Sequence, residues 1–111
     1  MWIFTTSGFV SAVRNTDDRA IIVRSRDRES LIPISKKYQA EIKPTPLADY
    51  PYRVRIKHDK FIEWISAEAS NIDYPNFKSR VHDTRGDTWV NALLDVWSAM
   101  CDVTDSAARG R

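Results

Sequence analysis

The stretch that decides the fold is Trp2–Arg26, WIFTTSGFVSAVRNTDDRAIIVRSR, in which turn signals separate three β-forming runs. Thr6-Ser7-Gly8 supplies the small residues of a tight connection after the first run. Asn15-Thr16-Asp17-Asp18 forms the second turn, because Asn and Asp side chains bond to nearby backbone. The stretch therefore predicts a three-stranded meander with Phe9–Val13 at its centre.

The third run, Ala20–Arg26, shows how the sheet should divide its two faces. Side chains alternate along a strand, so Ile21 and Val23 share one face. Ile22, Arg24 and Arg26 share the other face, which changes from apolar to basic along the strand. One face is thus expected to be dry and the other to reach solvent.

Length and composition set the class of protein. A chain of 111 residues with 42% hydrophobic content is large enough for one domain with its own core. The single cysteine, Cys101, leaves no intramolecular disulfide and no cysteine-rich zinc site. With no apolar run long enough for a signal peptide or a membrane span, we expect a cytoplasmic protein that needs no membrane, cofactor or metal.

Charge is segregated along the chain although its formal net value is only +2. Residues 20–60 hold ten Lys and Arg against five Asp and Glu, and residues 61–105 hold three against eight. Such asymmetry is typical of a polyanion-binding surface or of two surfaces that attract each other. It is also compatible with the solvated exterior of a monomer, the state that we favour over an oligomer.

The middle of the chain predicts further sheet material. A short helix follows Asp27, and Pro33 should kink or split it because proline breaks a helix interior. Residues 40–43 suit a short edge strand, and three prolines make residues 44–51 a rigid loop. Tyr52–Lys57, YRVRIK, then alternates cleanly between apolar and basic side chains, as a half-buried strand does.

The C-terminal part switches to helical periodicity. Helices are expected from about Asp59 to Asn71, from Pro75 to a terminator at Gly86, and from Asp87 or Thr88 onward. The last helix has the best apolar stripe and is predicted to be the main cover of the sheet. The fold class is thus α+β, an antiparallel sheet covered by C-terminal helices, with residues 1–105 as a single domain and 106–111 as a flexible C-terminal tail. The stripe comprises Val90, Leu93, Leu94, Trp97, Met100 and Cys101.

Five segments carry a family resemblance that extends through most of the chain: WIFTTSGFVSAV, VRSRDRESL, YRVRI, IDYPNFKSRV and VWSAM. Together they resemble a set of small uncharacterised proteins of actinobacteria and their bacteriophages. Val10 and the surroundings of Trp89 depart from that pattern. The resemblance implies a cytoplasmic protein of actinobacterial or phage origin, and it implies no activity and no catalytic residue.

Catalytic chemistry has few candidates. His58 and His82 are the two histidines, and with neighbouring Lys and Arg they could run the acid–base cleavage of RNA that small ribonuclease toxins use. Both stand in polar surroundings typical of solvated histidines, and no pair of ligands has metal-site spacing. We therefore expect no enzyme, and keep the histidine-dependent ribonuclease as an alternative.

Two binding hypotheses remain. The first is a small interaction protein that contacts a host protein through exposed aromatic anchors, as a phage-encoded protein would. The second is a nucleic-acid-binding module in which cations contact phosphates and rings stack on bases. Its rings could equally belong to the core. The protein-binding set is Tyr50, Tyr52, Trp64, Tyr74 and Trp89, and the nucleic-acid set is Trp2, Phe4, Arg24, Arg26, Arg53, Arg55 and Lys57.

Overall fold

The computed structural model describes the backbone of residues 1–109 and the side chains of residues 1–104. The chain divides into two compact units, Met1–Asp73 and Tyr74–Arg111. The first unit holds a sheet and its helices, and the second is helical. Within the described residues, no helix combines the length and the apolar character that crossing a membrane requires.

The first unit is built on a five-stranded antiparallel sheet, which confirms the α+β class. The strands lie in the order β1-β2-β3-β5-β4, so β1, β2 and β3 form the predicted meander with β2 at its centre. β5 returns beside β3 and is itself flanked by the short edge strand β4. The bounds are β1 Trp2–Thr5, β2 Gly8–Arg14, β3 Ile21–Ser25, β4 Lys43–Pro44 and β5 Tyr52–Ile56.

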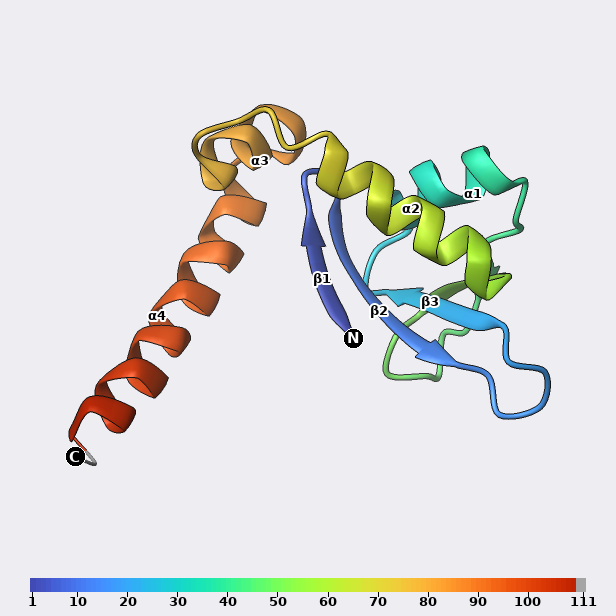
Figure 1. Ribbon diagram of the computed structural model, residues 1–111, viewed down its shortest axis with the longest axis horizontal. Coiled ribbons are helices and arrows are strands. Elements are labelled where there is room, and N and C mark those ends of the chain that lie inside the picture. Colours follow the sequence, from blue (N-terminus) through green and yellow to red (C-terminus); the bar gives the residue numbers. More distant parts are fainter. Residues whose placement is uncertain (110–111) are drawn as a thin grey trace. The chain divides into compact units, whose positions relative to one another are not determined.

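Helices cover one side of this sheet. The 3-10 helix η1 (Glu29–Leu31) runs into α1 (Ile32–Tyr38), and α2 (His58–Ser70) follows β5. Both α-helices lie on the same side of the sheet (Figure 1). The helical segment is indeed split, but between Leu31 and Ile32. Pro33 stands in the first turn of α1, where its missing N–H costs nothing, and not in a helix interior as the sequence predicts.

The core of the first unit lies between these helices and the sheet. Its strand residues are the apolar half of the predicted alternation, such as Val23 and Val54, which are at most 1% exposed. The helices add four large side chains to it. They are Leu31, Ile34, Phe61 and Trp64.

The second unit is a pair of helices, α3 (Phe77–Arg85) and α4 (Asp87–Arg109). The Asn76 side chain accepts a hydrogen bond from the Ser79 backbone N–H and so caps the start of α3. Gly86 ends α3 with φ at +81°, a left-handed value that favours glycine, as its position in the sequence predicts.

The stripe of α4 is not the buried surface that its periodicity predicts. Leu93 is buried, but Leu94 is 41% and Trp97 62% exposed. α4 also continues to Arg109, so it includes the first four residues of the predicted tail, whose last two lie outside the described residues.

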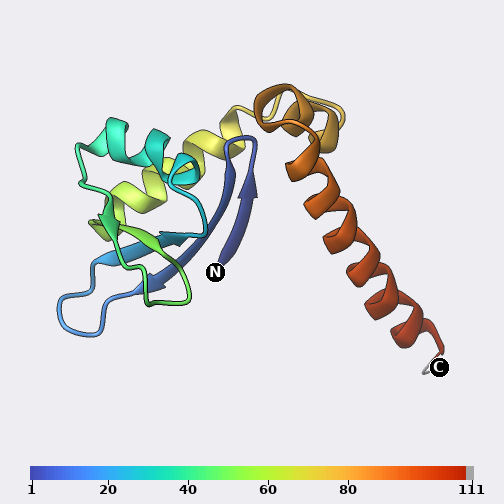
Figure 2. The ribbon, with the colours of Figure 1, turned by 180° about the vertical axis from the view of Figure 1, so that it is seen from behind.

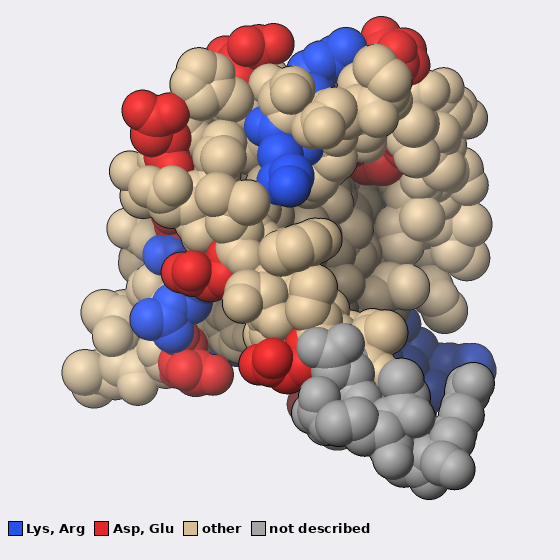
Figure 3. Space-filling model, turned by 90° about the vertical axis from the view of Figure 1, so that its left-hand side faces the viewer, with Lys and Arg blue, Asp and Glu red and all other residues tan. Residues whose placement is uncertain are grey.

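The segregation of charge along the sequence does not produce large areas of one sign on the face that Figure 3 displays. Basic and acidic side chains are interspersed there, and uncharged residues cover most of the area.

Candidate nucleic-acid interface

The open sheet face is the side of the sheet opposite α1 and α2. Strand register places one row of side chains across it, because Trp2 pairs with Ser11, Ser11 with Arg24, Arg24 with Arg53 and Arg53 with Lys43. The row crosses all five strands, which at a spacing of about 4.8 Å corresponds to about 19 Å. Trp2 at its end is 71% exposed.

Four aromatic rings form a cluster on the open sheet face. Phe9 stands at its centre, with ring centroids 5.9 Å from Trp2, 4.8 Å from Phe4 and 6.5 Å from Tyr50. Phe4 and Phe9 pair directly across the first hairpin. The cluster therefore presents rings, including the exposed indole of Trp2, to whatever contacts this face.

Arg24 is held in position beside the rings. Its Nη2 donates to the Ser11 Oγ at 2.7 Å, and its guanidinium carbon lies 4.7 Å from the centroid of the Tyr50 ring. A guanidinium over an aromatic face is attracted by the ring electrons. Arg24 is thus ordered before any ligand arrives.

Arg26 has a different role, because it fastens the loop that carries Tyr50. Its Nη1 donates to the Asp49 carbonyl oxygen at 2.7 Å and lies 3.5 Å from the carboxylate of the same residue. The loop of residues 45–51, green in Figure 2, runs along the side of the sheet opposite the helices. Arg26 therefore supports the interface through the loop.

Arg53 and Arg55 line a groove of about 410 Å³ next to the edge strand. The Nε of Arg53 is buried and has no hydrogen-bond partner among the described residues. A buried donor without an acceptor is costly, so this position carries a local energetic penalty within the sheet. The groove is lined by Ile22, Glu41, Lys43, Arg53, Val54 and Arg55.

The structure brings together most of the predicted nucleic-acid set. Trp2, Phe4, Arg24, Arg53 and Arg55 lie on the open sheet face, and Arg26 lies just beyond the end of β3. Lys57 follows β5 and lines a separate pocket.

Sequence reasoning missed Phe9 and placed Tyr50 in the other set. Phe9 could have been found from the two-residue hairpin turn, which puts it opposite Phe4. Tyr50 reaches the face through a loop, and no local pattern encodes that approach.

The members of the predicted protein-binding set are divided between the two units. Trp64 is only 5% exposed and belongs to the core, so its assignment as a surface anchor is wrong. Tyr52 packs against the same core, and Tyr50 belongs to the ring cluster. Tyr74 and Trp89 lie in the second unit, each half-buried with an arginine over its ring.

The two histidines fall in different units. His58 begins α2, whereas His82 lies in α3 with its Nε2 3.0 Å from the Asp87 Oδ1. Among the described residues, no group of three or more His, Cys, Asp or Glu side chains could hold a metal ion.

Comparisons with protein-family models, with curated proteins and with solved structures gave no match to this chain.

Proposed function

We propose that the protein binds single-stranded nucleic acid on the open sheet face. The observation that carries the proposal is the ring cluster of Trp2, Phe4, Phe9 and Tyr50 beside Arg24, whose register partner on β5 is Arg53. Rings stack on bases of any sequence, and arginines contact phosphates, so the pair suits an extended strand. Sheets that bind RNA in this way stack two or three bases, which suits a row of about 19 Å.

The electrostatics of the face supports the same ligand. Arg24 is ordered by Ser11 and Tyr50 without an ion pair to a carboxylate among the described residues, so its charge remains available. Arg53 is the partner of Arg24 on β5 and lines the groove, so it brings a second cation to the face. Lys43, exposed at the end of the row, adds a third cation.

Fluorescence anisotropy with labelled oligo-dT and oligo-U tests the proposal. Trp2→Ala should weaken binding roughly 5- to 150-fold, since a base–ring stack contributes about 1–3 kcal/mol. Trp97→Ala removes an exposed tryptophan from α4 and serves as the matched control, for which we expect no change.

Arginine variants separate phosphate contacts from general charge. Arg24→Ala should weaken binding and lower the salt slope by about 0.7, the value for one phosphate contact on a single strand. Arg28→Ala, an exposed arginine outside the face, is its control. A protein that ignores both oligonucleotides at low salt, or equal losses for Trp2→Ala and Trp97→Ala, would contradict the proposal.

A second function is favoured by a separate observation, the exposed stripe on the C-terminal half of α4. Val96, Trp97, Met100 and Val103 are 39–62% exposed and follow one another at helical spacing. We propose that this stripe docks in an apolar groove of a host protein, with Trp97 as the central anchor, as amphipathic helices do. The preference for a host protein rests on the resemblance to proteins of actinobacteria and their phages.

Affinity capture from an actinobacterial lysate, compared between wild type and Trp97→Ala/Met100→Ala, tests the docking proposal. The partner should be lost with the variant and retained with Trp2→Ala. Sedimentation that shows wild-type self-association, abolished by the same variant, would assign the stripe to a second copy instead.

A further inference from the structure

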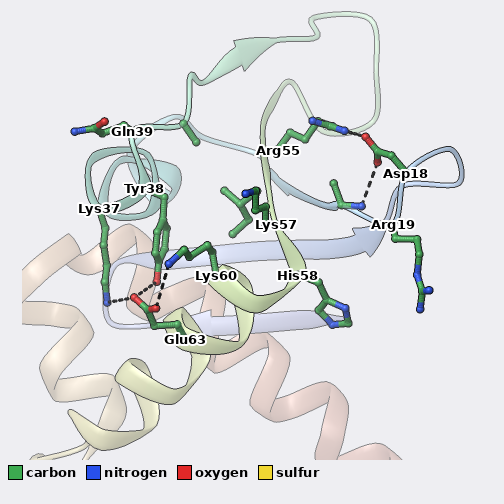
Figure 4. A pocket seen from close by; sticks show the side chains of 13 residues that line it. Asp18, Arg19, Lys37, Tyr38, Gln39, Arg55, Lys57, His58, Lys60 and Glu63 are labelled. Atoms are coloured by element: carbon green, nitrogen blue, oxygen red, sulfur yellow. Dashed lines mark hydrogen bonds and ion pairs between the residues drawn. The ribbon is translucent and has the colours of Figure 1, made fainter.

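A basic pocket of about 890 Å³ lies in the first unit, where four segments converge (Figure 4). It is formed by the turn after β2, the end of α1, the end of β5 and the start of α2. The charged side chains in its lining are Asp18, Arg19, Lys37, Arg55, Lys57, Lys60 and Glu63.

Cations exceed anions in this lining by five to two, a net charge of +3 with His58 neutral. Asp18 pairs with Arg55, and Glu63 is shared by Lys37 at 4.0 Å and Lys60 at 3.7 Å. The two carboxylates therefore compensate only part of the positive charge.

Arg19 and Lys57 supply the uncompensated charge. Both are exposed, and neither has an ion pair within the part of the chain whose side chains the structure describes. In Figure 4, Lys57 lies between the Lys37–Glu63–Lys60 group and the Arg55–Asp18 pair. Arg19 stands in left-handed backbone, with φ at 65°, in the turn that borders the pocket.

The pocket and the open sheet face share one residue. Arg55 lines both the basic pocket and the groove that contains Arg53. A chain of phosphates that passes Arg53 in the groove can therefore continue past Arg55, which is paired with Asp18, to the unpaired Lys57.

We infer that the basic pocket binds backbone phosphates of the same single strand, as that strand leaves the open sheet face at Arg55. The inference rests on the proposed nucleic-acid function and extends it from a short contact on the sheet to a longer footprint. The open sheet face stacks bases, and the pocket neutralises phosphates with Arg19 and Lys57.

Binding of a tetranucleotide and a dodecanucleotide of oligo-dT tests the inference, because only the longer one spans the face and the pocket. Wild type should bind the dodecanucleotide more tightly. Arg19→Ala/Lys57→Ala should weaken dodecanucleotide binding roughly tenfold and lower its salt slope by about 1.4, for two phosphate contacts. Tetranucleotide binding should stay within about twofold, because it depends on the face. Arg28→Ala/Lys36→Ala removes two exposed cations outside the pocket and is the matched control.

The outcomes separate this inference from the proposed function. A wild type that binds neither oligonucleotide overturns both. If wild type binds both oligonucleotides while Arg19→Ala/Lys57→Ala keeps the same salt slope and the same preference for the dodecanucleotide over the tetranucleotide, the result overturns the role of the pocket alone. A wild type without a length gain, which instead binds inorganic tripolyphosphate through Arg19 and Lys57, assigns the pocket to a free phosphate compound and also overturns the strand path.

Discussion

Helices α2 and α4 have similar apolar periodicity, but the apolar side chains of α2 are buried and most of those in the C-terminal half of α4 are exposed. In α2, Phe61 and Trp64 are 6% and 5% exposed, whereas Trp97 and Met100 in α4 are 62% and 55% exposed. The difference lies in what each helix has beside it. α2 faces a sheet, but within its own unit α4 has only α3 to face.

Helix lengths show why α3 leaves α4 incomplete. At 1.5 Å per residue, the nine residues of α3 extend about 14 Å and the 23 residues of α4 about 35 Å. The first turns of α4 can therefore bury Leu93, while its C-terminal half extends past α3. Periodicity identifies the apolar face of a helix, and a neighbour of matching length decides whether that face is covered.

The largest expected contrast compares one tryptophan from each helix. Trp64→Ala should lower the free energy of unfolding by about 3–5 kcal/mol, because it opens a cavity in the core. Trp97→Ala should cost about 1 kcal/mol or less, because the exposed ring loses mainly its contact with Lys78. Urea unfolding measures both. If Trp64→Ala does not fold, Ile34→Val, at about 1 kcal/mol, still tests the same core.

Adjacent leucines in α4 sharpen the comparison within one helix. Leu93→Ala should destabilise the second unit by about 2 kcal/mol and Leu94→Ala by about 1 kcal/mol, since the first is 8% and the second 41% exposed. Hydrogen exchange of α3 and α4 amides reports the change. A reversed order would mean that the buried side of α4 had been misassigned.

The start of α3 gives a smaller effect. Asn76→Ala removes the side-chain acceptor of the Ser79 N–H and should cost about 1 kcal/mol. Exchange should rise in the first turn of α3. Asn91→Ala, on the exposed side of α4, is the control and should change little.

The smallest expected effect is a pH dependence in the first unit. Burial raises the pKa of Glu68 above its ordinary value, and the Lys37 ammonium partly opposes this shift. A raised folded-state pKa gives stability that is present below the unfolded pKa and is lost as the pH rises through the folded pKa. The stability of Glu68→Gln relative to wild type should therefore increase as the pH rises above about 4, the ordinary pKa of a glutamate. If the free energies of unfolding of wild type and Glu68→Gln, measured in urea, depend on pH in the same way, the pKa of Glu68 is not raised.

Local patterns were sufficient for most of the sheet. Gly8 and Asn15 mark turns through their own backbone preferences, so the meander and the alternation of Tyr52–Ile56 could be predicted from short windows of sequence. Burial of the α4 stripe could not be predicted, because it depends on a neighbour that periodicity does not name.

The candidate site shows the same division. Arg24 and Arg53 could be placed on one face by alternation, and register then confirmed that they are partners across β3 and β5. Tyr50 and the basic pocket could not be predicted, because they depend on loops and on segments far apart in the sequence that meet only in the folded chain.

Arg19 and Gln39 both line the basic pocket with left-handed backbone, and at Arg19 this sets stability against ligand binding. A side chain with positive φ costs about 1–2 kcal/mol relative to glycine. Selection of random variants for heat resistance alone should therefore enrich Arg19→Gly and Gln39→Gly. The first of these would also remove a pocket cation, so the most heat-resistant clones should bind long strands less well than their parent.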